Sequence, residues 1–167
     1  MGEAIMKTEH IRDISIGVAV ITVSTTRTEE TDTSGRTIRE HLEGAGYPVR
    51  FYRIVKDDQV AIRAALICSL SDADAVILNG GTGLTSDDCT IEAVEPFYEK
   101  RIDGFGEIFR RLSYEEIGTS ALLSRASAGV AGGRAIFCIP GSTGAVRLAM
   151  ADIIIPELRH ILSHARG

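Results

Sequence analysis

The 167-residue sequence lacks the features that mark several large classes of protein. No stretch approaches the ~20 consecutive apolar residues of a membrane-spanning helix, and the N-terminus carries no long apolar segment of the kind found in secretion signals. Low-complexity segments and internal repeats are also absent. We therefore expect a cytoplasmic protein with no membrane partner.

Cysteines and blocks of like charge are also scarce. The three cysteines, Cys68, Cys89 and Cys138, lie far apart and form no C-x-x-C pair, which is typical of reduced thiols and argues against a zinc site. The formal net charge is −5, and no block of like charge occurs along the chain, so nothing indicates a surface for nucleic acid. A phosphorylated ligand would therefore need local attraction rather than an overall positive charge.

The sequence does contain enough apolar residues for one core. Hydrophobic residues make up 44% of the chain, which at this length predicts a single globular domain that needs neither disulfides nor a structural metal. We place this domain at residues 14–167. The polar residues 1–13 are interpreted as a loose arm or an oligomer contact, and no chemistry is assigned to them.

Apolar runs typical of strands alternate with amphipathic runs typical of helices. The expected strands are residues 14–23, 49–55, 75–78 and 134–139. The first of them is a nearly unbroken β-branched run, as in strands that are buried on both faces of a parallel sheet. Capping residues at 32–35 and 56–58 predict a helix after each of the first two strands. This alternation predicts a three-layer α/β fold, with a mostly parallel central sheet, helices on both faces and right-handed crossovers.

The pattern becomes less regular after the third expected strand. Shorter helical pieces are expected at 90–98, 105–112 and 119–125, and a longer helical region at 145–162. Residues 127–130 and 134–139 flank Gly132-Gly133 and are predicted to pair as a hairpin. In the last region Pro156 predicts a break between two helices.

The densest group of glycines, Gly80-Gly81-Thr82-Gly83, follows the third expected strand directly. Glycine lets main-chain N–H groups approach a ligand closely, and N–H groups that open a helix favour an anion. A simple turn from strand to helix would use the same residues. The loop lacks the lysine and the spacing of a P-loop and does not match G-x-G-x-x-G, which argues against an ATPase or a dinucleotide dehydrogenase.

Two other expected strands also end in small residues. Ser24-Thr25-Thr26 follows the first strand, and Pro140-Gly141-Ser142 follows the last core strand. In parallel sheets, ligands bind outside the carboxyl ends of the strands. Three strand ends able to present N–H and hydroxyl groups therefore favour a crevice for a phosphate-bearing ligand.

Asp57 and Asp88 are expected near the same edge of the sheet. Each also has a simpler role as a helix cap. Carboxylates near a phosphate would repel it unless a cation lay between them, and Mg²⁺ bound by one or two carboxylates together with phosphate oxygens suits this arrangement. His160 and His164 lie four residues apart without an acidic partner at matching spacing, which favours surface histidines over a metal site.

These motifs occur in an order that resembles the MoaB/Mog family of molybdenum cofactor biosynthesis proteins, from about residue 14 to the C-terminus. The shared blocks are Gly80-Gly81-Thr82-Gly83 with Asp88, Thr90, Glu92 and Ala93, and Pro140-Gly141-Ser142. Segments 32–35, 105–110, 114–120 and 124–126 are similar to the MoaB branch. The resemblance implies a molybdopterin-binding fold, a homotrimer or a hexamer built from trimers, and Mg²⁺-dependent adenylylation of molybdopterin by ATP.

The resemblance also implies roles for particular residues. Asp57 and Asp88 match the positions that the family uses for catalysis and for the metal. Binding of the nucleotide or pterin phosphate would fall to Ser24, Thr25, Gly80, Gly81, Thr82, Gly83, Gly141 and Ser142. One departure concerns Asp87, because the adenylylating branch has arginine there. Two hypotheses follow: a molybdopterin adenylyltransferase (a nucleotidyltransferase) that releases pyrophosphate, or a non-catalytic molybdopterin-binding or scaffold protein of the same pathway.

Overall fold

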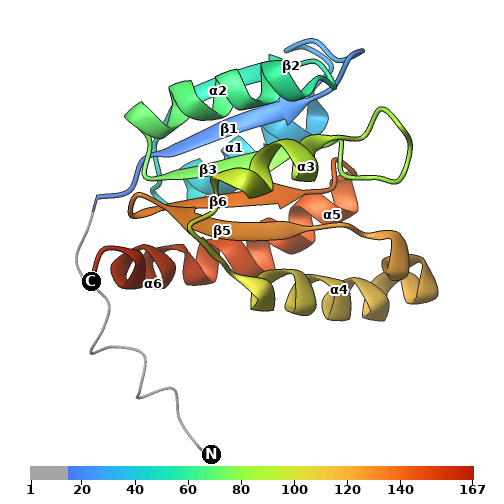
Figure 1. Ribbon diagram of the computed structural model, residues 1–167. Coiled ribbons are helices and arrows are strands. Elements are labelled where there is room, and N and C mark those ends of the chain that lie inside the picture. The colour runs from blue at the N-terminus through green and yellow to red at the C-terminus, as the bar shows by residue number, and fades with distance from the viewer. Residues whose placement is uncertain (1–14) are drawn as a thin grey trace, which may run out of the picture.

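The computed structural model describes residues 15–167 (Figure 1). The strands are β1 (Val18–Val23), β2 (Val49–Val55), β3 (Ala75–Asn79), β4 (Lys100–Arg101), β5 (Ser127–Ala131) and β6 (Arg134–Ile139). The helices are α1 (Thr33–Gly44), α2 (Gln59–Asp72), α3 (Thr90–Val94), α4 (Asp103–Ile117), α5 (Thr143–Leu148) and α6 (Ile155–Ala165). Short 3₁₀ segments are η2 (Glu95–Phe97) and η3 (Gly118–Leu123), and η4 (Ala149–Ile154) is π-helical. The predicted arm at residues 1–13 lies outside the described residues.

Within the described residues the strands form one six-stranded sheet in the order β2-β1-β3-β6-β5-β4. The first four strands in this order, β2, β1, β3 and β6, are parallel to one another. Strand β5 runs antiparallel to both of its neighbours, β6 and β4. Helices α1, α4, α5 and α6 cover one face, and α2 and α3 cover the other (Figure 1). The predicted three-layer α/β fold is therefore confirmed.

The β-branched run that begins the sheet is buried on both faces because successive side chains of a strand point in opposite directions. Val18 and Val20 belong to the core under α1 and α6, whereas Ala19 and Ile21 belong to the core under α2. All four side chains have no exposed surface. The run is thus apolar throughout because both of its faces pack against helices.

Local signals predicted most element boundaries, although β1 begins later than predicted, at Val18, and α4 extends beyond the predicted residue 112 to Ile117. Asp32 caps α1 by accepting a hydrogen bond from the N–H of Gly35 at 3.0 Å, and Asp58 caps α2 by accepting one from the N–H of Ala61 at 2.8 Å. The β5–β6 hairpin is confirmed, with both glycines of its turn at positive φ. The two-residue strand β4 was not expected, because two residues are too few for a strand pattern.

The predicted break at Pro156 is wrong. The helical path continues from α5 through η4 into α6, and Pro156 lies in the first turn of α6. The wide π turn just before it, which forms i→i+5 hydrogen bonds, accommodates a residue that has no N–H to donate. In residues 15–167 no helix is both long and apolar enough to cross a membrane.

The Asp74 carboxylate connects several segments at the amino-terminal ends of the parallel strands, opposite the glycine loop. Asp74, just before β3, accepts hydrogen bonds from the N–H of Gly17 at 2.8 Å and from the Arg166 guanidinium, and Arg50 lies 3.5 Å away. Burial alone would raise the pKa of Asp74, but these three groups outweigh it and hold the pKa below its ordinary value. Asp74 thus connects the C-terminal residues to the start of two central strands.

We expect Asp74→Asn to lower the free energy of unfolding at pH 7 by about 1–3 kcal/mol. The substitution removes the charge of the carboxylate that accepts the hydrogen bonds from Gly17 and Arg166, and hydrogen bonds to a charged group are stronger than those to a neutral one. A carboxylate whose folded-state pKa is depressed stabilises the fold above its unfolded pKa of about 3.9 and loses this contribution as the pH falls through the folded pKa. Urea titrations should therefore show the wild type losing more stability than the variant below about pH 5. Asp72→Asn, at an exposed position, is the control; an equal loss in both variants would contradict the role of Asp74.

Candidate ligand-binding site at the carboxyl ends of the strands

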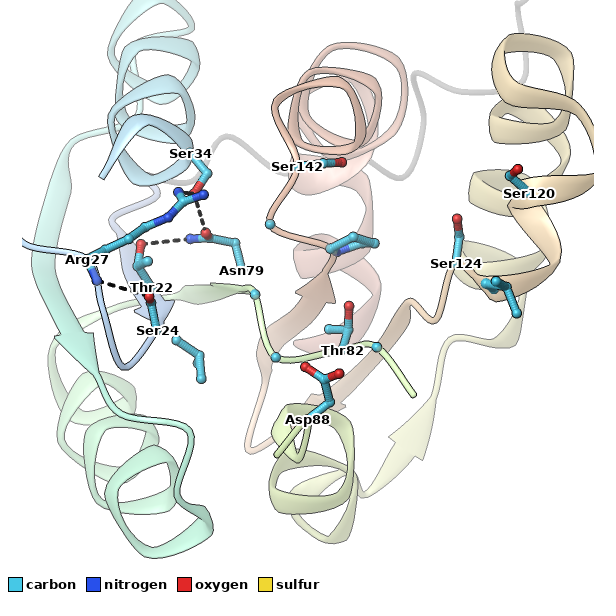
Figure 2. Close-up of a pocket in the computed structure, with 17 residues that line it drawn as sticks. Thr22, Ser24, Arg27, Ser34, Asn79, Thr82, Asp88, Ser120, Ser124 and Ser142 are labelled. Atoms are coloured by element: carbon cyan, nitrogen blue, oxygen red, sulfur yellow. Dashed lines mark hydrogen bonds between the residues drawn. The ribbon is translucent and has the colours of Figure 1, made fainter. Parts of the chain in front are cut away.

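A cavity of about 480 Å³ opens at the carboxyl ends of β1, β3 and β6 (Figure 2). In the sheet, β2 lies on one side of β1 and β3 lies on the other. The order of the strands therefore reverses direction at β1. The connections after β1 and β3 separate at such a point and leave space for a ligand. Residues of η3 and Ser124, which follows it, form a further wall of the cavity.

Most of the predicted site residues line this cavity: Ser24, Gly80, Gly81, Thr82, Gly83, Asp88, Gly141 and Ser142. The predicted shared crevice is therefore present in the structure. Thr25 and Asp57 are not part of its lining. Thr25 borders a neighbouring cavity, and Asp57 lies beside the glycine loop, with Oδ1 3.1 Å from where a Cβ of Gly81 would lie. The ligand-binding roles of all these residues stay predictions.

The backbone of the glycine loop requires glycine at its first two positions. Gly80 and Gly81 have φ angles of +91° and +65°, a region that other residues rarely adopt. Thr90 holds both: its hydroxyl donates to the Gly80 carbonyl at 2.7 Å, and its N–H donates to the Gly81 carbonyl at 3.0 Å. The loop main chain is thus positioned before any ligand binds.

Asp57 and Asp88 are held in the same way, each by a nearby threonine. Asp88 Oδ2 accepts from the N–H and the hydroxyl of Thr85 at 3.1 and 2.8 Å. Asp57 Oδ2 accepts from the N–H and the hydroxyl of Thr25 at 3.1 and 2.9 Å. In both carboxylates the other oxygen, Oδ1, has no hydrogen-bond partner within residues 15–167.

The alternative role of these two aspartates as helix caps is wrong. The cap of α2 is Asp58, and α3 begins after Cys89 without a side-chain capping bond. The pKa of the Cys89 thiol is raised by burial and by the surrounding carboxylates, which makes it a poor nucleophile.

The donor set fits Mg²⁺ bound together with phosphate oxygens. Mg²⁺ usually takes one or two protein carboxylates and completes its coordination with water and phosphate. The part of the chain that the structure describes has no cluster of three or more His, Cys, Asp or Glu side chains suited to hold a metal. A cation held there would take some of its ligands from a carboxylate and the others from oxygens of a phosphorylated ligand and from water.

The histidine pair lies outside the cavity. His160 and His164 have ring centroids 4.8 Å apart on α6 and border a different cavity. The expectation that they have no acidic partner is wrong, because Glu157 Oε2 lies 2.9 Å from His160 Nδ1, one helical turn away.

A buried polar network below the cavity was not predicted. Asp32 has no exposed surface and accepts hydrogen bonds from Thr22 at 2.7 Å, from Tyr52 at 2.5 Å and from the N–H of Gly35 at 3.0 Å, while Ser34 Oγ lies 3.3 Å from its Oδ1. Burial alone would raise the pKa of Asp32, but these hydrogen bonds hold the pKa below its ordinary value, so the carboxylate stays ionised. Burial and the Asp32 charge together raise the pKa of Tyr52.

Asn79, the last residue of β3, connects this network to the cavity. Its Nδ2 donates to Thr22 Oγ1 at 2.9 Å, and its Oδ1 accepts from Ser34 Oγ at 2.8 Å (Figure 2). Ser34 in turn accepts from Nη1 of Arg27 at 2.6 Å. The sequence offered one signal for Arg27, a cation four residues after the end of a strand, but no signal for the pairing between these residues.

Arg125 joins the glycine loop to the opposite wall of the cavity. Its Nε donates to the Thr82 carbonyl at 2.8 Å, and its Nη1 pairs with Glu92 of α3 at 2.6 Å. The hydrogen bond from Arg125 lowers the pKa of Glu92 below its ordinary value. Arg125 directly follows Ser124, which lines the cavity, so one side chain connects three segments around the site.

The fold and the cavity together define an α/β protein with a small-molecule site at its parallel strand ends. Residues 19–160 match the family described as a probable molybdopterin binding domain. The chain is 52% identical over 150 residues to the molybdenum cofactor biosynthesis protein B of Bacillus subtilis (strain 168), with 88% of each chain covered.

Solved structures give the same result. A crystal structure of molybdenum cofactor biosynthesis protein B is 49% identical with a TM-score of 0.88, covering 92% of this chain and 97% of that one. The tungsten cofactor synthesizing protein MoaB from Pyrococcus furiosus is 40% identical with a TM-score of 0.84, covering 92% and 98%. The chain therefore belongs to the MoaB/Mog family of molybdenum cofactor biosynthesis proteins, as its motifs predict.

Proposed function

We propose that this protein is a molybdopterin adenylyltransferase, which joins AMP from ATP to the terminal phosphate of molybdopterin in the presence of Mg²⁺ and releases pyrophosphate. The observation that supports this most strongly is the composition of the cavity. An open glycine loop, one arginine and one carboxylate with a free oxygen line a space of about 480 Å³. These are the groups that bind and align phosphates.

The reaction needs alignment more than it needs a base. A phosphate oxygen of molybdopterin, already ionised at neutral pH, attacks the α-phosphorus of ATP; the bond to the bridging oxygen breaks, and pyrophosphate leaves with the electron pair. The N–H groups of the glycine loop donate to phosphate oxygens and hold the two reactants in line. Thr90 and Arg125 keep that loop in position. Asp88, with Asp57, would hold Mg²⁺, which when bound neutralises phosphate charge.

The second candidate function is a non-catalytic molybdopterin-binding or scaffold protein of the same pathway. Asp87 favours it, because an exposed anion stands next to Asp88 where the adenylylating branch has arginine. Such a protein would keep the cavity and bind the pterin without transferring AMP.

Incubation of the purified protein with ATP, Mg²⁺ and molybdopterin separates the two functions. An adenylyltransferase yields adenylylated molybdopterin and one pyrophosphate per product, and chelation of Mg²⁺ abolishes both. Binding of molybdopterin without either product would contradict the proposed enzyme and support the scaffold.

We also propose that the protein assembles as a homotrimer or as a hexamer of two trimers. The end of α4 and the adjoining η3 expose four large apolar side chains by more than half: Tyr114 by 59%, Ile117 by 53%, Leu122 by 85% and Leu123 by 59%. Exposed apolar patches of this kind mark interaction surfaces.

Sedimentation velocity should show a trimer or a hexamer at micromolar concentration. Leu122→Asp should shift the protein towards smaller species, because an ionised side chain in an apolar interface loses its hydration. Val60→Asp, at an exposed apolar position on α2, is the control. A wild-type monomer under these conditions would contradict the assembly.

A further inference from the structure

The described residues that line the cavity include one cation and one anion, and these come from different walls. Arg27 lies in the connection between β1 and α1, whereas Asp88 precedes α3 (Figure 2). We propose that Arg27 is the anion-recognition residue of this cavity and binds the phosphate of a phosphorylated ligand. The inference deepens the proposed function and rests on it for the identity of the ligands.

The guanidinium of Arg27 is anchored through one nitrogen only. Nη1 donates to Ser34 Oγ at 2.6 Å and lies 3.6 Å from Asp32 Oδ1. Nε and Nη2 have no partner within residues 15–167, and the side chain is 36% exposed. An arginine carries five N–H donors, so most of this guanidinium is left for a ligand.

The main chain around Arg27 is also fixed. Ser24 Oγ accepts hydrogen bonds from the N–H groups of Thr26 and Arg27 at 3.3 and 3.1 Å. Ser34, the anchor of the side chain, is buried and donates to Asn79. Arg27 is therefore held at both its backbone and one side-chain nitrogen before a ligand binds, which reduces the entropy lost on binding.

A purely structural role for Arg27, as the counter-ion of Asp32, explains less. Asp32 already accepts hydrogen bonds from Thr22, Tyr52 and Gly35, and these bonds lower its pKa. The buried carboxylate is thus satisfied without Arg27. The negative charge of Asp32 stabilises the Arg27 guanidinium at the wall of the cavity. The N–H groups on Nε and Nη2 of Arg27 remain available to a ligand.

The geometry of these donors matches phosphate. The planar guanidinium fork binds phosphate with two parallel hydrogen bonds, which a lysine ammonium cannot reproduce. Asp87 leaves the glycine-loop side without the cation that the adenylylating branch has there, and Arg27 supplies positive charge from the opposite side. The cavity then has a cationic wall for a phosphate group and, at Asp88, an anionic wall for a phosphate that carries Mg²⁺.

Paired ligands with and without phosphate test the inference. The dissociation constants of ATP and adenosine, and of molybdopterin and dephosphorylated molybdopterin, are measured calorimetrically with Mg²⁺ for the wild type, Arg27→Gln and Arg27→Lys. Arg27→Gln should weaken a phosphorylated ligand by about 10- to 100-fold and leave its phosphate-free partner unchanged. Arg27→Lys should show a smaller loss, because it keeps the charge but not the fork.

Arg53→Gln is the matched control. Arg53 borders the neighbouring cavity with Arg27 but is absent from the lining of this one, and it carries the same charge. A loss confined to molybdopterin assigns Arg27 to the pterin phosphate, and a loss confined to ATP assigns it to the nucleotide; both support the inference. Equal weakening of phosphorylated and phosphate-free ligands, or an equal effect of Arg53→Gln, would overturn it.

The result does not depend on turnover. If the protein binds phosphorylated ligands through Arg27 but forms no adenylylated product, the proposed enzymatic function is contradicted and this inference stands. If the protein forms the product but Arg27→Gln leaves the affinity for phosphorylated ligands unchanged, the enzymatic function stands and this inference is contradicted. Circular dichroism checks the fold of each variant. If Arg27→Gln does not fold, Arg27→Lys becomes the test. An unchanged affinity of Arg27→Lys for phosphorylated ligands would contradict phosphate binding by the Arg27 guanidinium fork.

Discussion

Asp88→Asn is expected to reduce adenylyl transfer by about 10²- to 10³-fold, the usual effect of removing a group that stabilises charge in the transition state. The amide keeps the size of the carboxylate and an oxygen that can accept from Thr85, so the loop keeps its shape. What it loses is the negative charge that would hold Mg²⁺ against phosphate. The measurement is the initial rate of adenylylated molybdopterin formation at saturating ATP and Mg²⁺.

Asp87→Asn is the matched control for this experiment. Asp87 is the next residue, is exposed, and forms no hydrogen bond or ion pair in the described part of the chain. Its substitution changes the net charge by the same amount and should leave the rate close to that of the wild type. A full rate in Asp88→Asn would contradict the metal role. A rate increase in Asp87→Asn would show that Asp87 restrains turnover.

Gly80→Ala is expected to lower the free energy of unfolding by about 2–4 kcal/mol, from a strained backbone and a steric clash together. Its φ angle of +91° is unfavourable for any residue with a Cβ. That Cβ would lie 2.4 Å from the Val23 carbonyl oxygen, so two neighbouring strand ends would have to separate. Urea unfolding measures the loss of stability, and calorimetry with ATP should show weaker binding because the loop moves.

Gly104→Ala is the control for the glycine substitution. Gly104 lies in the first turn of α4, and a Cβ there would meet no atom within 4 Å. Alanine at a helical position without strain stabilises a protein by about 0.4–1 kcal/mol. Equal stability of Gly80→Ala and the wild type would show that the loop relaxes without cost and would contradict the rigid positioning argued for it.

Elements whose signals lie within a few neighbouring residues could be predicted from the sequence. Strand β2 has the predicted bounds, Val49–Val55, and α1 begins after the capping oxygen of Asp32. The meeting of Ser24, Gly80 and Gly141 was also predictable, because parallel strands bring their carboxyl ends to one edge. The helical path through Pro156 was not, since π turns are rare and a proline inside a helical pattern usually ends or kinks the helix.

The parts of the site that sequence patterns did not reveal depend on pairs of residues far apart in the chain. Tyr52 reaches Asp32 from a neighbouring strand, and Arg125 reaches the Thr82 carbonyl from 43 positions away. A polar residue in a sequence carries no sign of which distant group will satisfy it.

The sequence by itself determined the layers, the strand ends and the glycine loop, because periodicity and φ requirements are local properties. Only the tertiary structure decided which oxygens of Asp57 and Asp88, and which nitrogens of Arg27, are left without a hydrogen-bond partner within residues 15–167. These choices depend on hydrogen bonds that form once the chain has folded, because only then do the segments that supply the partners lie side by side.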